Sequence, residues 1–322
     1  MAALLIALAG CGPNGYFEAP LGKEREFLTV DFESGRDLRY KFVSSREITV
    51  GWDAPQTAAR LRTRAGDKSS ESMEVVMLYK PIEIDPYGLT TLEATCESVN
   101  VSRSKGPQMD AVQSLAGRTF TLTVGPTGRI ADYSQLDEIL KEIGKKAFRT
   151  NTDSGRTKDP DMIGDFVASQ WFLWDSISSI EEPSKGVKVG QSWKSKLSVP
   201  TPMVMREARD VTYTLDEIRA GENGRLAVIT SSYKAADSVP RTWPIPYWGS
   251  FQMKGPFGFY RNYKVLSLEG RGEELFNIDA GRVERCDQEY ELQLSASLLL
   301  PLPGANPKIT IDQSLTMELL ED

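Results

Sequence analysis

The sequence predicts a mainly β protein of the α+β class, in which antiparallel, curved sheet carries two amphipathic helices. Runs of alternating apolar and polar residues fill most of the chain, which is typical of half-buried strands. Turns rich in Gly and Pro separate these runs. Two other segments, near residues 134–148 and 160–180, place their apolar residues at helical spacing instead.

The first β-rich half is expected to span residues 36–185, after a tether over residues 11–35. Its strands follow from the alternation of apolar and polar side chains, and one further strand is expected within the tether. The polar stretch 53–72 predicts a loop or a short helical excursion. The predicted strands cover residues 23–32, 38–50, 72–84, 88–101 and 120–124.

The two helices carry recognisable start signals. Ser134 is expected to cap the first helix, because Asp137 follows in the capping-box position. Acidic residues at its start and lysines at its end suit the helix dipole. Asp159 and Pro160 predict the cap and first turn of the second helix. Its broad aromatic face requires burial against a sheet or a ligand.

A second β-rich half is expected over residues 186–322. The separation between Tyr40 and Gly128 equals that between Trp193 and Gly281. Each pair joins an aromatic strand residue to a Gly-containing turn. Internal duplication explains this match, and so does the general recurrence of such patterns in β proteins.

The N-terminus has the form of an export signal ending in a lipobox, Leu8-Ala9-Gly10-Cys11. Its apolar run is far shorter than the ~20 residues of a transmembrane helix, and small residues precede the cleavage position. We therefore expect residues 1–10 to be a signal segment and Cys11 to carry lipid that anchors the chain to a membrane. Gly12 favours the periplasmic face of the bacterial outer membrane over the inner membrane. A buried first strand is the alternative, but the turn-rich residues after Cys11 oppose it.

Composition excludes several classes of function. The net charge of −7 argues against a nucleic-acid partner, since phosphate binding needs clustered cations. Histidine is absent, so the chain has no Ser-His-Asp or Cys-His nucleophile and no histidine ligand for a metal. We expect no cofactor and no metal site. Chemistry based on carboxylates alone is compatible with this composition.

Two cysteines remain if Cys11 is acylated, and an exported location permits a disulfide between them. Cys96 lies in a predicted strand and Cys286 follows a hairpin-like turn. Because they are far apart and belong to no recognised framework, we expect two separate thiols packed as small apolar residues.

Aromatic residues are densest between residues 243 and 263, where Pro and Gly interrupt any regular strand. Four cations and no acidic residue occur between residues 238 and 268. Aromatic rings stack on sugars or line acyl pockets, and nearby cations hold anionic head groups. The predicted ligand-binding residues are Trp243, Tyr247, Trp248, Tyr260, Arg241 and Arg261. The alternative is a loop over the sheet edge whose aromatic side chains belong to the core.

The chain resembles a group of uncharacterised bacterial lipoproteins with a domain of unknown function. The similarity rests on the lipobox, the strand 40–42, the segment 120–129 before the first helix, and residues 189–193. It covers roughly residues 36 to 292 and implies no catalytic residues. In architecture alone, the chain is also similar to envelope lipid carriers of the LolA and LppX type, although fold does not fix function.

The leading hypothesis is a non-enzymatic envelope lipoprotein, a binding or scaffold module for a lipid or other amphiphilic ligand. A glycan is the other ligand class considered, and the membrane is the expected partner through Cys11. The alternative function is a carboxylate-dependent hydrolase of envelope glycans. A hydrolase requires two carboxylates about 5 to 9 Å apart in a cleft, whereas a carrier requires an apolar cavity between sheet and helices.

Overall fold

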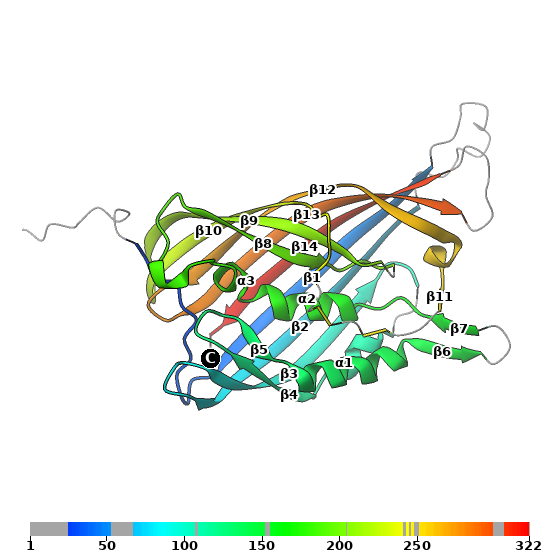
Figure 1. Ribbon diagram of the computed structural model, residues 1–322. Helices are drawn as coiled ribbons and strands as arrows, with labels where there is room; N and C mark the ends of the chain where they lie inside the picture. Colours follow the sequence, from blue (N-terminus) through cyan, green and yellow to red (C-terminus); the bar gives the residue numbers. More distant parts are fainter. Residues whose placement is uncertain are drawn as a thin grey trace, which may run out of the picture.

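A computed structural model describes residues 25–52, 67–106, 109–151, 155–203, 205–240, 243–244, 246–247, 251–298 and 306–321. It confirms the predicted mainly β, antiparallel and curved fold. The dominant element is one eleven-stranded sheet that is curved but not closed (Figure 1). Its strands are β1 (Leu38–Trp52), β2 (Asp67–Ile84), β3 (Thr90–Arg103), β4 (Thr119–Val124), β5 (Ile130–Asp132), β8 (Ser192–Val199), β9 (Glu207–Gly221), β10 (Gly224–Ala235), β12 (Tyr260–Asn277), β13 (Arg282–Leu298) and β14 (Pro307–Leu320).

The strand order is β5-β4-β3-β2-β1-β14-β13-β12-β10-β9-β8. The chain therefore runs from β1 outward to one edge, crosses to β8 at the other edge, and returns strand by strand to β14 beside β1. Both predicted halves contribute to this one sheet. Gly128 and Gly281 each lie in the turn after the fourth strand of its meander, both with positive φ. Internal duplication stays a prediction.

The crossing segment holds the helices α1 (Ser134–Lys146), α2 (Ile163–Phe172) and α3 (Asp175–Ser178), on one face of the sheet (Figure 1). The first predicted helix ends two residues early, and the second is divided into α2 and α3 at Leu173 and Trp174. A small sheet of β6 (Phe148–Asn151), β7 (Gly155–Lys158) and β11 (Gln252–Met253) lies beside them. The 3-10 turns are η2 (Ala111–Leu115), η3 (Pro183–Lys185) and η4 (Pro256–Phe259).

The predicted helix caps are wrong in position. Ser134 is the first helical residue, and its N–H donates to the carboxylate of Asp132. In the second helix, the carboxylate of Asp161 accepts the N–H of Ile163. The N-cap residues are Tyr133 and Met162, whose side chains make no capping bond, and in each helix the aspartate one position earlier accepts the first helical N–H instead.

The strand expected over residues 23–32 is wrong over its described part. Only Glu26 forms a bridge, with Val187. The segment instead crosses the end of the sheet, where Val30 donates to the carbonyl of Pro126 and Asp31 to that of Gly281. Leu28 and Val30 are buried there, so the alternation arose from one-sided burial rather than from strand pairing.

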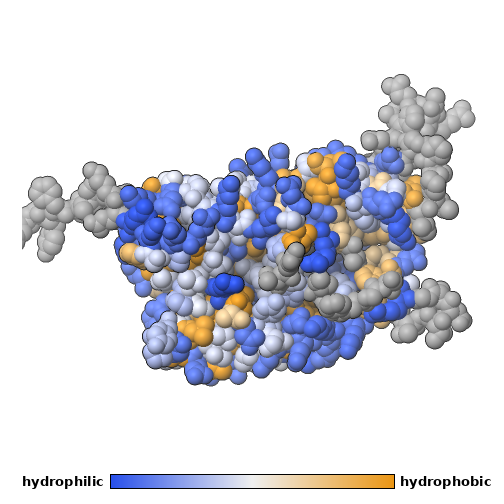
Figure 2. Space-filling view, viewed as in Figure 1, coloured by the Kyte–Doolittle hydropathy of each residue, from blue (hydrophilic) through white to orange (hydrophobic). Residues whose placement is uncertain are grey.

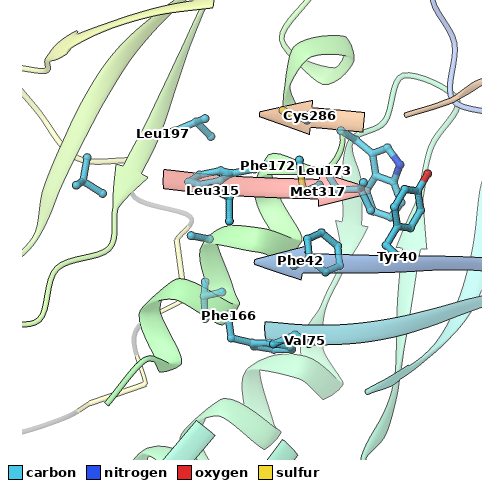
Figure 3. Packing of buried hydrophobic residues seen from close by; sticks show 14 of the residues in the cluster. Tyr40, Phe42, Val75, Phe166, Phe172, Leu173, Leu197, Cys286, Leu315 and Met317 are labelled. Atoms are coloured by element: carbon cyan, nitrogen blue, oxygen red, sulfur yellow. The ribbon is translucent and has the colours of Figure 1, made fainter. Parts of the chain in front are cut away.

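The core lies between the sheet and the helices. Inward residues of the central strands, such as Phe42 and Met317, form one buried cluster with Phe166 and Phe172 of α2 (Figure 3). Trp174 closes the cluster at its end, with its ring 5.8 Å from that of Tyr79. No helix in the described ranges is long and apolar enough to cross a membrane.

Candidate functional site

A cavity of about 310 Å³ lies at the end of the sheet where β1 ends and β12 begins. Its walls come from β1 to β3, from the residues before α2, and from the segment that leads into β12. The side chains of β1 that reach it, Ile48 and Val50, belong to the buried face of the strand. The apolar lining residues are Ile48, Val50, Pro160, Pro202, Phe257 and Tyr260.

The segment 254–260 forms the outer wall of this cavity through a tight turn. Gly255 adopts φ 74°, and a Cβ on Gly258 would collide with the carbonyl oxygen of Met253. The guanidinium of Arg261 donates to the carbonyls of Gly258 and Tyr260. Glycine and arginine together therefore fix the turn that places Phe257 and Tyr260 against the cavity.

Charged groups occupy one side of the cavity. Glu71 accepts hydrogen bonds from Nε of Arg46 at 2.6 Å and from Nε of Arg103 at 2.8 Å. Burial alone would raise the pKa of Glu71, but the charge of Arg46 and the bonds from Arg103 outweigh it and lower that pKa. Glu71 thus stays ionised and is a poor proton donor. Two exposed lysines, Lys105 and Lys254, also line the cavity and mark its rim.

The structure separates the predicted ligand-binding residues into two groups. Tyr260 lines the cavity, and Arg261 stabilises the turn in the cavity wall through its hydrogen bond to the carbonyl of Gly258. Trp243 instead packs on α2, with its ring 5.6 Å from that of Trp171. Tyr247 donates to the carboxylate of Asp161, and Nζ of Lys158 lies 4.2 Å from its ring centroid. Arg241, Trp248 and Cys11 lie outside the described residues.

Sequence reasoning missed most of the cavity. Lys254 belongs to the cationic stretch that drew attention to this region, so its type and place could have been predicted. Ile48 and Val50 carry only the alternation that every inward strand residue shows. Which inward residues border a cavity depends on strand order, and strand order is not encoded locally.

A larger, open groove of about 1020 Å³ crosses the outer face of the central strands. Serines such as Ser45 and Ser314 line it together with acidic side chains. Glu47 and Glu291 stand directly opposite Asp312 in the sheet. Partial burial first, and then the charges of Glu291 and Glu47, raise the pKa of Asp312. Across the described part of the chain, no group of three or more Cys, Asp or Glu side chains is placed so that it could hold a metal ion.

The two strand cysteines are separate, as expected. Cys96 and Cys286 are both buried free thiols. Burial raises the pKa of Cys96 to about 12, and the nearby charge of Glu97 adds to this shift. Neither thiol is therefore poised for nucleophilic chemistry.

Comparison with known families gives a match over the middle of the chain. The family described as "Family of unknown function (DUF6263)" matches residues 71–231, which is half of the chain. The chain belongs to this family. No curated protein matches the chain. The DUF6263 region runs from β2 to β10 and includes the helices, so it holds Arg103, Pro160 and Pro202 of the cavity. Ile48, Val50 and the segment 254–260 lie outside the DUF6263 match.

Proposed function

We propose that the protein is a lipid-anchored envelope protein that binds a small anionic amphiphile without catalysing a reaction. The observation that carries this proposal is the cavity between sheet and covering segments, with apolar walls and two exposed lysines at its rim. Apolar walls bind a hydrocarbon chain, because removing its surface from water contributes roughly 25 cal/mol per Å². The rim amines would bind the anionic head group.

The size of the cavity limits the ligand. Ligand pockets commonly span about 300–1,000 Å³, and 310 Å³ is at the lower end of that range. We therefore propose a single, short hydrocarbon chain rather than a lipid with several long chains. The resemblance to LolA- and LppX-type carriers that the sequence suggests also favours an amphiphilic ligand, and the chain has a curved sheet with helices on one face.

Charge at the rim supports an anionic head group. Nζ of Lys254 lies 3.6 Å from the carboxylate of Asp159, and both side chains are accessible to solvent. The ammonium of Lys254 lies on an exposed side chain and its separation from Asp159 is long for an ion pair, so Lys254 can turn toward a ligand anion. Glu71 on the cavity side is already held by two arginines, so it does not neutralise the rim.

The proposed anchor is the lipidated Cys11, at the periplasmic face of the outer membrane. Its support is the lipobox Leu8–Cys11 and the Gly12 that follows it. The intact mass of the protein extracted from its native host tests this part. A mature chain that begins at an acylated Cys11 is expected, and an uncleaved chain with unmodified Cys11 would overturn it.

The ligand proposal is tested by calorimetric titration with dodecyl phosphate below its critical micelle concentration. We expect saturable binding of one molecule per chain. The double variant Lys105→Gln/Lys254→Gln should bind about tenfold more weakly and with less dependence on salt. The matched control, Lys188→Gln/Lys194→Gln, removes two exposed lysines near the β8 edge of the sheet and should bind as the wild type does. Absence of saturable binding by the wild type would contradict the proposal.

A further inference from the structure

We infer that the β2–β3 hairpin is a membrane-contact surface, which rests on the bilayer that holds the proposed anchor. This inference uses the anchor of the proposed function but not its ligand. Four large apolar side chains protrude from the hairpin: Ile82 is 52% exposed, Ile84 37%, Tyr87 87% and Leu89 39%. We call these four residues the hairpin patch.

The hairpin patch is an ordered part of the fold. The carboxylate of Asp85 accepts the N–H groups of both Tyr87 and Leu89. The N–H of Asp85 in turn donates to the carbonyl of Leu89 at 3.0 Å. Gly88 supplies the positive φ of 81° that the turn needs. The exposure of these side chains is therefore built into a rigid turn, and clustered apolar exposure usually marks a contact surface.

The hairpin patch lies at the end of the molecule where the N-terminal segment runs. A Cβ on Gly88 would lie 3.4 Å from Pro126, and the carbonyl of Pro126 accepts the N–H of Val30. Phe27, three residues before Val30 in the same segment, is also exposed. Figure 1 shows this segment and the β2–β3 hairpin at the same end of the sheet, at the lower left, while η4 and the cavity wall lie at the opposite end.

The length of chain before Arg25 keeps this end close to an anchor. The residues between Cys11 and Arg25 can span at most about 50 Å. The 18 residues of β2 alone extend over about 60 Å. An anchored chain therefore brings the hairpin patch to the bilayer more readily than the far end of the sheet, where the cavity lies.

The chemistry of the hairpin patch favours a bilayer over a charged partner. Tyrosine is enriched at the membrane interface, where its ring meets the head groups. The strand beside the tip carries exposed Lys80 and Glu83, so the local charge is mixed. The surrounding face is mostly hydrophilic, with its hydrophobic residues in separate small groups (Figure 2). Binding should therefore depend on apolar insertion and only weakly on salt.

Flotation with phosphatidylcholine vesicles tests the inference. The chain from residue 11, with Cys11→Ser to remove the anchor, is compared with the same chain carrying Tyr87→Ser/Leu89→Ser. We expect measurable binding of the first, and at least tenfold weaker partition of the second at an unchanged melting temperature. The control Met109→Ser/Leu266→Ser removes two comparably exposed apolar side chains elsewhere, 87% and 51% exposed, and should leave partition unchanged.

Three outcomes would overturn the inference: no vesicle binding by the parent chain, equal partition of the hairpin variant, or an equal loss in the control. If the hairpin patch captures a protein partner but the parent chain does not bind vesicles, the first of these outcomes applies and the inference is wrong. Titration of the hairpin variant with dodecyl phosphate keeps the proposals distinct. Normal titration with lost flotation of this variant supports the hairpin patch, whereas a parent chain that floats normally but does not bind dodecyl phosphate contradicts the ligand proposal alone.

Discussion

Arg46 of β1 and Asp165 of α2 form an ion pair inside the core, with 3.0 Å between Nη1 and Oδ2. Both side chains are almost completely shielded from solvent. Ser44 also donates to Asp165, so one carboxylate joins α2 to two residues of the same strand. The helix is thus held on the sheet by buried charge as well as by apolar packing.

Replacement of Asp165 by Ala should destabilise the protein by about 3–5 kcal/mol, because it leaves Arg46 with less compensation in the core. The control is Asp210→Ala, which breaks a solvent-accessible pair with Lys196 and should cost about 1 kcal/mol or less. Urea unfolding of both variants measures the difference. Equal and small losses would show that the buried pair does not hold α2.

Glu274 makes stability depend on pH. Burial raises its pKa to about 8, although the hydrogen bond from Ser176 lowers it in part. Between the ordinary value near 4.5 and pH 8, the native state therefore holds one more proton than the unfolded chain. The free energy of unfolding should fall as pH rises through this window, by up to about 1.4 kcal/mol per unit from this group.

The variant Glu274→Gln should remove that component, so its stability should decline less between pH 5 and 8 than that of the wild type. Glu269→Gln, at an exposed position of the same strand, is the control and should keep the wild-type slope. Urea unfolding at several pH values provides the comparison. Parallel curves for wild type and Glu274→Gln would contradict the assignment.

Gly281 should tolerate no side chain. It adopts φ 61°, and a Cβ would lie 2.5 Å from Cβ of Asp31 in the crossing N-terminal segment. Gly281→Ala should therefore cost roughly 3–4 kcal/mol, from left-handed strain and overpacking together. At Gly190, φ is 83° and no atom lies within 4 Å of such a Cβ, so Gly190→Ala should cost only about 1–2 kcal/mol. Similar losses in thermal unfolding would mean that the N-terminal segment does not pack closely on this turn.

Local patterns predicted much of the fold. The alternation over residues 72–84 and 88–101 corresponds to β2 and β3, and the helical spacing after Ser134 corresponds to α1. The break between α2 and α3 was not predictable, because an apolar face continues through Trp174. The side chain of Trp174 packs on Phe32 and Tyr79, from distant parts of the chain.

The buried charges were also beyond local reasoning. Arg46 stands between Ser44 and Ile48 on the inward face of β1, where a sequence pattern indicates only an interruption of the apolar side. Its partners Glu71 and Asp165 come from other elements. Tyr260 was selected as a candidate from aromatic density, but its cavity neighbours Ile48 and Val50 meet it only through the strand order.

The central claim, that the cavity binds a hydrocarbon chain, is tested most directly by filling it. Calorimetric titration with dodecyl phosphate compares wild type, Val50→Trp and Thr49→Trp, the last of which places the same side chain on the opposite face of β1. We predict that Val50→Trp loses saturable binding while remaining folded, and that wild type and Thr49→Trp bind one ligand with similar affinity. Undiminished binding by a folded Val50→Trp variant would contradict the account.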